Sequence, residues 1–205
     1  MSKILSICLG VILACITFVS NAVDMTNPYI LASEVATTTV NELKANKDKL
    51  SDKDFARSLV QKELMPYVDI KYAAYKVMGA SLNKTTPQER EEFTKAFEEY
   101  MVQSLSDVLG KYVNQDIVPE PNKVIPKDAS IVSVKFTIKE QGKKDLFMVL
   151  KMRLNKKTSE WKVFDLVGEN ISILDAKESE ISPIIKSKGI AAAIETLKNL
   201  KIEIK

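Results

Sequence analysis

The sequence contains no histidine, and both of its cysteines, Cys8 and Cys15, lie within the first 22 residues. From residue 23 onward the chain therefore offers neither imidazole nor thiolate. This excludes zinc sites built on those ligands, and it excludes nucleophilic sites of the Ser-His-Asp or Cys-His type. A domain of this size can bury enough core to fold without disulfides, even outside the cytoplasm.

Glycine is scarce, and the glycines after residue 22 stand singly at positions 79, 110, 142, 168 and 189. No glycine-rich phosphate loop is present, which argues against nucleotide hydrolysis. Long basic tracts are also absent. The net charge is +3, and it falls to +2 without Lys3. Acidic and basic residues are interspersed, so we expect no nucleic-acid partner.

The first 22 residues have the layout of a secretory signal. Lys3 is followed by an almost wholly apolar run, Ile4–Val19, and then by Ser20-Asn21-Ala22 with small residues at the positions a signal peptidase reads. We predict cleavage after Ala22 and a single domain with a helical annex over residues 23–205. The alternative is a lipoprotein site at Cys15. The apolar run continues beyond that cysteine, which favours soluble export.

Helical signals dominate up to about residue 110. Asn27-Pro28 predicts a first helix, and Ser51 with Asp54 resembles a capping box that opens a second. Pro66 interrupts it, and we expect a third helix from Tyr67 to Met78, ended by Gly79. Thr86-Pro87-Gln88-Glu89 is the clearest start, and the helix that it opens is predicted to run toward Gly110.

The character of the sequence changes after Tyr112. Prolines at 119, 121 and 126 indicate an extended passage with an edge strand. Three segments then alternate with period two, 131–139, 145–155 and 161–167, separated by polar turns. Residues 171–174, a short helix near Pro183–Lys188 and a final helix Ile190–Leu200 close the chain. The order predicts an α+β fold with an antiparallel sheet covered by helices on one face.

Large apolar side chains crowd the proposed inner surfaces, and this pattern has two interpretations. They form either an ordinary packed core or the lining of a cavity, in which adaptable methionines suit acyl chains. Asp165 lies in an apolar strand, where it either bonds backbone amides or acts as a general base. Lysines and arginine between residues 143 and 157 either protect a sheet edge or form a docking surface.

Several blocks of the chain resemble the MlaC family, the periplasmic phospholipid-binding proteins of the maintenance-of-lipid-asymmetry (Mla) pathway, also known as toluene-tolerance auxiliary proteins. The blocks are Asn27-Pro28-Tyr29, residues 63–69 and 72–79, Thr86–Phe93, Trp161–Asp165 and Gly189-Ile190. They stand in family order and span nearly all of the chain after residue 22. Two departures are Glu169-Asn170, where the family usually has Glu-Gly, and Met152, where it tends to have an aromatic residue.

The resemblance implies a twisted antiparallel sheet, similar to nuclear-transport-factor-like or cystatin-like folds, wrapped by helices around an apolar pocket. It implies a periplasmic, monomeric carrier without enzymatic activity, cofactor or metal, whose cargo is a phospholipid with its headgroup near solvent. The implied partners are an inner-membrane ABC transporter with an MCE-domain subunit and an outer-membrane lipoprotein complex.

From this resemblance and the apolar patterns we expect twelve residues to line the pocket. They are Tyr67, Val68, Tyr72, Val77, Phe97, Tyr100, Met101, Met148, Leu150, Met152, Trp161 and Val163.

Two other functions remain open at this point. One is a small-ligand enzyme on the same scaffold, with Asp165 and a tyrosine such as Tyr100 in acid–base chemistry. Such an enzyme would have a small pocket with a carboxylate at its base, whereas a carrier pocket is long and apolar. The other is a structural adaptor of an export pathway, which would have a filled core.

Overall fold

A computed structural model describes residues 23–200 of the chain. The predicted signal sequence, its cleavage after Ala22 and the alternative lipidation of Cys15 lie outside the described residues. The α-helices are α1 (Pro28–Ala45), α2 (Lys53–Glu63), α3 (Ile70–Met78), α4 (Pro87–Leu109), α5 (Ile173–Lys188) and α6 (Ile190–Asn199). Short 3-10 turns connect the early helices: η1 (Lys47–Lys49), η2 (Met65–Tyr67) and η3 (Gly79–Lys84).

The strands form one antiparallel sheet in the order β1 (Asp116–Pro119), β2 (Ile131–Lys139), β3 (Leu146–Asn155), β4 (Glu160–Gly168) and β5 (Ile171–Ser172). Val134 pairs with Leu150, and Leu150 with Leu166, so apolar side chains of the three long strands share one face. The register shifts between Lys151 and Met152, a bulge that increases the local twist. The predicted α+β class with an antiparallel sheet is confirmed.

Most of the helix boundaries follow from side-chain caps. Thr86 and Glu89 form the predicted reciprocal capping box at the start of α4. At α2, however, the cap is Asp52, whose carboxylate accepts from the backbone N–H groups of Asp54 and Phe55, so the assignment to Ser51 was wrong. The third helix also starts later than predicted. Asp69 caps α3, and residues 67 and 68 precede it.

The C-terminal region differs most from the prediction. Residues 171–172 form the short strand β5, and a single sixteen-residue helix, α5, continues through Pro183 instead of a short helix around it. An interior proline costs about 3 kcal/mol because it removes one backbone hydrogen bond. Burial of Leu174, Ile181 and Ile185 in the core stabilises the continuous helix against that loss.

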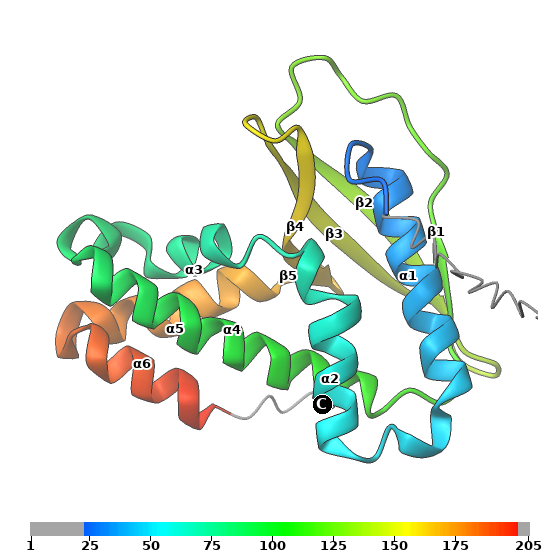
Figure 1. Ribbon diagram of the computed structural model, residues 1–205, viewed down its shortest axis with the longest axis horizontal. Coiled ribbons are helices and arrows are strands. Elements are labelled where there is room, and N and C mark those ends of the chain that lie inside the picture. The colour runs from blue at the N-terminus through cyan, green and yellow to red at the C-terminus, as the bar shows by residue number, and fades with distance from the viewer. Residues whose placement is uncertain (1–22, 201–205) are drawn as a thin grey trace, which may run out of the picture.

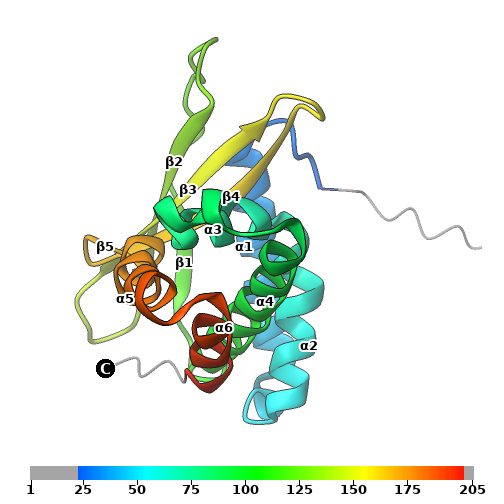
Figure 2. The same ribbon diagram turned by 90° about the vertical axis from the view of Figure 1, so that its left-hand side faces the viewer.

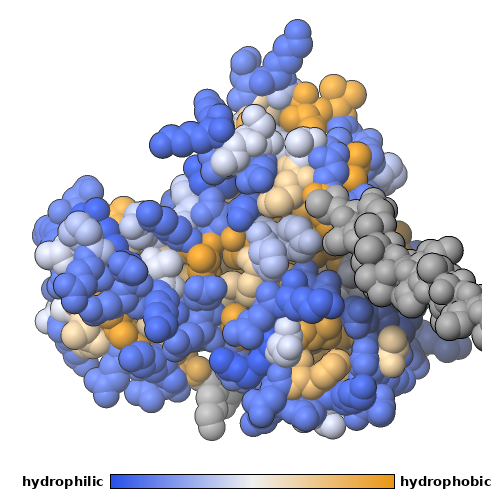
Figure 3. Space-filling view, in the orientation of Figure 1, coloured by the Kyte–Doolittle hydropathy of each residue, from blue (hydrophilic) through white to orange (hydrophobic). Residues whose placement is uncertain are grey.

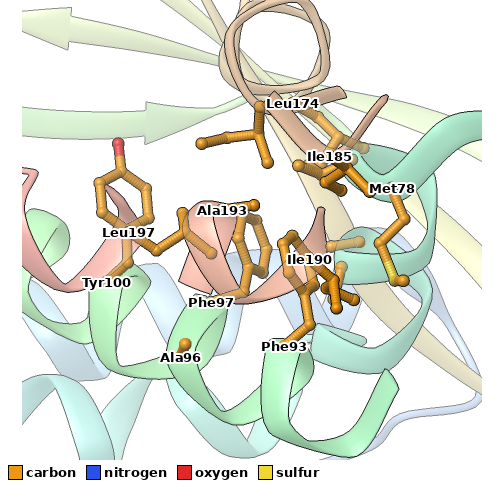
Figure 4. Close-up of a cluster of buried hydrophobic side chains, with 14 of the residues drawn as sticks. Met78, Phe93, Ala96, Phe97, Tyr100, Leu174, Ile185, Ile190, Ala193 and Leu197 are labelled. Carbon is orange, nitrogen blue, oxygen red and sulfur yellow. The ribbon is translucent and has the colours of Figure 1, made fainter. Parts of the chain in front are cut away.

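Two larger hydrophobic clusters and a small one around Leu43, Leu50 and Leu59 make up the core of the described residues. One lies inside the helices α3, α4, α5 and α6, where Figure 4 shows Phe93 and Phe97 among side chains of the other three helices. The other lies between α1 and the sheet, and it contains Leu31, Phe136 and Met152. Figures 1 and 2 show the helical group at one end and the sheet with α1 at the other. The space where the two clusters face each other holds the site described next.

Candidate functional site

A cavity of about 540 Å³ lies between the inner face of the sheet, α1, α4 and the start of α5. Its volume is within the ~300–1,000 Å³ typical of small-molecule pockets. Protein interiors are close-packed and hold few voids larger than a water molecule. A hollow of this size therefore indicates a ligand site, and it is incompatible with the filled core that the structural-adaptor hypothesis requires.

Helical faces form one side of the cavity. On α1 the lining residues recur at positions 31, 32, 35, 36 and 39, and on α4 at 100, 101, 104, 105, 108 and 109. Both series follow the spacing of one face of a helix. The α1 series was missing from the sequence prediction. Leu31 and Val35 stand at helical spacing in the sequence, which indicates an apolar helix face but does not show that this face borders a cavity.

The sheet forms the opposite side through alternate residues of β2 and β3 and, in β4, through residues on either side of the irregularity at Phe164. Lining side chains come from Ile117 of β1, and from Phe136, Ile138, Met148, Leu150, Met152, Val163 and Leu166 of β2, β3 and β4. Because successive side chains of a strand point to opposite faces, the period-two pattern of the sequence predicts this grouping. It cannot predict that α1 and α4 stand far enough from the sheet to leave a hollow.

A second cavity of about 140 Å³ adjoins the first and shares nine lining residues with it, including Tyr67, Met101 and Leu150. Val68, Ile70, Ala73 and Phe97 extend the lining toward α3. The two neighbouring cavities thus have a largely apolar lining that reaches from the sheet to the helical group.

The cavity reaches the molecular surface. Two of its lining residues are well exposed, Val108 of α4 at 42% and Ile171 of β5 at 65%. The space-filling view shows apolar surface in the middle of one face, between the helical group and the α1–α2 end, within a mostly hydrophilic exterior (Figure 3). A ligand with a long apolar part can therefore enter the space while its polar part stays outside.

The structure brings nine of the twelve expected residues together around the two cavities: Tyr67, Val68, Phe97, Tyr100, Met101, Met148, Leu150, Met152 and Val163. The other three lie elsewhere. Tyr72 packs edge-on against Phe164, Val77 is buried in the helical cluster, and Trp161 packs in the cluster between α1 and the sheet.

Few polar groups enter the main cavity. Lys177 at the start of α5 is the one charged side chain among its described lining residues. The hydroxyls of Thr39 and Tyr100 are buried, and neither has a hydrogen-bond partner within residues 23–200. Ser104 donates its hydroxyl proton to the Tyr100 carbonyl oxygen at 2.6 Å, which leaves it no proton for a ligand.

Asp165 borders the smaller cavity, and its carboxylate is fully engaged in structural bonds. It accepts from the Ser172 hydroxyl at 2.7 Å, from the Leu174 backbone N–H at 3.0 Å and from the Lys151 ammonium at 2.8 Å. The hydrogen bond from Lys151 to this carboxylate raises the pKa of the lysine. Asp165 therefore ties β3 and β4 to the start of α5, as expected of a carboxylate that bonds backbone amides.

The basic residues near the β2–β3–β4 hairpins do not form one surface. Lys143 and Lys144 precede β3, whereas Lys156 and Lys157 follow it, so ten strand residues or roughly 33 Å separate the two pairs. Lys151 bonds Asp165, and Arg153 bonds Asp69 and lies over the Tyr72 ring. The interpretation of these residues as one docking surface is not supported.

Within residues 23–200, acidic side chains nowhere gather in threes in a way that would hold a metal ion. In the same range, every helix is too short or too polar to cross a membrane.

Sheet, helices and a deep apolar cavity define a protein that binds an apolar ligand. The family model described as MlaC protein matches residues 33–199. The intermembrane phospholipid transport system binding protein MlaC of Haemophilus influenzae is 31% identical over 175 residues, which cover 84% of this chain and 81% of that protein. The chain belongs to the MlaC family, as the sequence blocks predicted.

Two further similarities agree with this assignment. The toluene tolerance protein ttg2D of Pseudomonas putida is 26% identical over 148 residues, which cover 71% of this chain and 67% of that protein. The phospholipid-binding protein of Ralstonia solanacearum, solved in complex with a phospholipid, superimposes with a TM-score of 0.74 at 16% identity. That similarity covers 83% of this chain and 94% of the other, and it shows a shared fold.

Proposed function

We propose that this protein carries phospholipid between membranes and performs no catalysis. The observation that supports this most is the apolar cavity of about 540 Å³ between sheet and helices. The proposal also follows from family membership and from the similarity to the Haemophilus influenzae relative, an intermembrane phospholipid transport system binding protein. By the same reasoning we infer a periplasmic location and export through the signal sequence.

Apolar burial explains why a carrier is needed. Two acyl tails contain about thirty methylenes, and at ~0.8 kcal/mol each their exposure to water costs on the order of 24 kcal/mol. Spontaneous escape of the lipid from a bilayer is correspondingly slow. A dry cavity offers the tails an environment similar to the bilayer, so transfer into the protein is nearly thermoneutral. The headgroup stays near solvent at the cavity mouth.

The proposed tail contacts come from three walls. The α1 wall includes Leu31 and Val35, the α4 wall includes Met101 and Leu105, and the sheet wall includes Leu150. Methionines in this lining, with flexible side chains, suit tails of different length.

Direction of transport must come from partner proteins, because the chain has no nucleotide-binding loop. We propose the partners that family membership implies. They are an inner-membrane ABC transporter with an MCE-domain subunit and an outer-membrane lipoprotein complex. We propose that the carrier binds each of them as a monomer.

The enzyme hypothesis requires a free carboxylate in the pocket, and Asp165 does not provide one. Its oxygens are occupied by Lys151, Ser172 and Leu174. A binding protein of the MlaC family needs no such group.

The test is to fill the cavity. Leu150→Trp replaces an isobutyl group by a bulky indole ring at a position that lines both cavities. The matched control is Val149→Trp on the same strand, whose side chain points to the opposite face of the sheet. We expect native mass spectrometry to find one phospholipid per chain in the wild-type protein and in Val149→Trp. Leu150→Trp should be purified without lipid and with an unchanged circular dichroism spectrum.

Lipid bound equally to the wild type and to folded Leu150→Trp would place the lipid outside this cavity. A wild-type protein purified without any lipid, and unable to extract it from vesicles, would contradict the carrier function itself.

A further inference from the structure

Lys177 is a charged side chain in an otherwise apolar wall. It lies on the first turns of α5 together with Ile173 and Ala176, which also line the main cavity. Its side chain is only 16% exposed. Ile171, which precedes this helix, is exposed and marks the opening to solvent. Lys177 thus lies near the mouth of the cavity, where the polar part of a bound lipid would be.

The surroundings of Lys177 keep it charged. Burial opposes the charge, but interactions with the Glu180 carboxylate and with the Tyr100 phenol outweigh it, so the pKa of Lys177 is raised. Its ammonium lies 2.5 Å from Glu180 Oε2. It also lies over the Tyr100 ring, 5.0 Å from the centroid, where it interacts with the phenol oxygen. An ammonium has three donors, and Glu180 uses one of them.

Tyr100 provides a second polar group at the same place. Only 3% of the residue is exposed, and no group among residues 23–200 accepts a hydrogen bond from its hydroxyl. A buried donor without an acceptor is unfavourable, and a phosphate oxygen would supply that acceptor. Figure 4 shows Tyr100 at the edge of the helical cluster, with its hydroxyl directed away from the other labelled side chains. The same residue lines the main cavity.

We propose that Lys177 and Tyr100 form a binding site for the phosphodiester of the lipid. The Lys177 ammonium pairs with the phosphate charge, and the Tyr100 hydroxyl donates to a phosphate oxygen. This inference rests on the proposed carrier function and adds a specificity to it. The site recognises the anionic group that all glycerophospholipids share and discriminates against uncharged diacylglycerol. Headgroups beyond the phosphate stay in solvent and are not distinguished.

Glu180 acts as the alternative partner of Lys177 when the cavity is empty. Its side chain is 38% exposed, so water can solvate the carboxylate when the lysine turns to a phosphate. Two anions next to one ammonium also repel each other. Removing the charge of Glu180 should therefore strengthen phospholipid binding.

The experiment compares two lipids with identical acyl tails, phosphatidylglycerol and diacylglycerol, in competition for the delipidated full chain. The variants are Lys177→Met, which keeps an unbranched apolar stem, Lys177→Arg, Tyr100→Phe and Glu180→Gln. Lys186→Met, at an exposed position of the same helix, is the matched control.

We expect the wild type to prefer phosphatidylglycerol at least tenfold. Lys177→Met should weaken phosphatidylglycerol binding about tenfold and leave diacylglycerol binding unchanged, because only the charged hydrogen bond is lost. Tyr100→Phe should weaken phosphatidylglycerol binding severalfold, Lys177→Arg should retain it, and Glu180→Gln should strengthen it severalfold. The control should match the wild type.

Equal affinity of the wild type for both lipids, or an equal loss of both in Lys177→Met, would overturn the phosphate site while leaving the carrier function intact. If Lys177→Met does not fold, Glu180→Gln decides: stronger phosphatidylglycerol binding supports the site, and unchanged binding overturns it. Failure of the wild type to bind either lipid contradicts the carrier function instead.

Discussion

Asp165 shows at the scale of one residue how a buried charge is accommodated. Its side chain is 1% exposed and is bonded by Lys151, Ser172 and the Leu174 backbone. Asp165→Ala leaves an ammonium and an N–H group without partners, and we expect the free energy of unfolding to fall by about 3 kcal/mol. Urea unfolding followed by circular dichroism measures this change.

The double variant Asp165→Ala/Lys151→Met serves as the control, because it removes both charges. It should recover part of the lost stability. A single variant as stable as the wild type would show that the carboxylate has no structural role.

The Lys151–Asp165 pair also predicts a pH dependence. The hydrogen bond to Asp165 raises the pKa of Lys151 above its ordinary value of 10.5. A pKa that is higher in the folded state stabilises the protein fully below pH 10.5, and this contribution disappears as the pH rises through the folded-state value. The difference in unfolding free energy between wild type and Lys151→Met should stay constant from pH 7 to 9 and shrink above pH 10.5. A constant difference up to pH 11.5 would contradict the ion pair.

At the scale of an element, the β4–β5 turn requires residues that tolerate a positive φ angle. Glu169 and Asn170 form a two-residue loop, since Gly168 pairs with Ile171, and their φ angles are 50° and 65°. Positive φ at both positions is typical of a type I′ turn. Asparagine adopts this region more readily than most residues, which explains how the chain forms a tight turn where the family usually has glycine.

Substitutions of Asn170 test whether the turn depends on a residue that tolerates positive φ. Asn170→Ala should lower the free energy of unfolding by about 1 kcal/mol because of strain in the left-handed region, whereas Asn170→Gly should leave it unchanged or raise it. Thermal unfolding of the two variants checks this. Equal stability of both would show that the turn does not depend on backbone conformation at this position.

Local chemistry explains which elements were predictable. The capping box at Thr86 and the alternation of the three long strands act over a few residues, so the sequence predicts α4, β2, β3 and β4 nearly to the residue. Two adjacent caps, Ser51 and Asp52, compete at α2, and only the folded backbone selects Asp52. Helix α5 passes through Pro183 because burial in the core overrides the local preference of proline.

The cavity itself belongs to the whole molecule and was less predictable. Periodicity places Met148, Leu150 and Met152 on one face, and the structure confirms that grouping. Whether that face meets another side chain or a hollow depends on how far α1 and α4 stand from it. No local pattern encodes that distance. The contribution of Leu31 and Val35 was missed for this reason.

An empty cavity of this size should make the apo protein less stable than the lipid-bound protein. Lost packing contacts destabilise the empty state, and a ligand that binds only the folded chain stabilises it by mass action. We expect delipidation to lower the thermal midpoint of the wild type by several degrees. Leu150→Trp, whose cavity is filled, should show no change on the same treatment. Equal shifts in the two proteins would contradict occupation of the cavity by lipid.

A crystal structure of the purified protein with its co-purified lipid tests the central claim most directly. The account predicts electron density for acyl chains between α1, α4 and the sheet, in contact with Met101 and Leu150, and a phosphate near the start of α5. Acyl density on the outer face of the sheet, with this cavity closed by side chains, would contradict it.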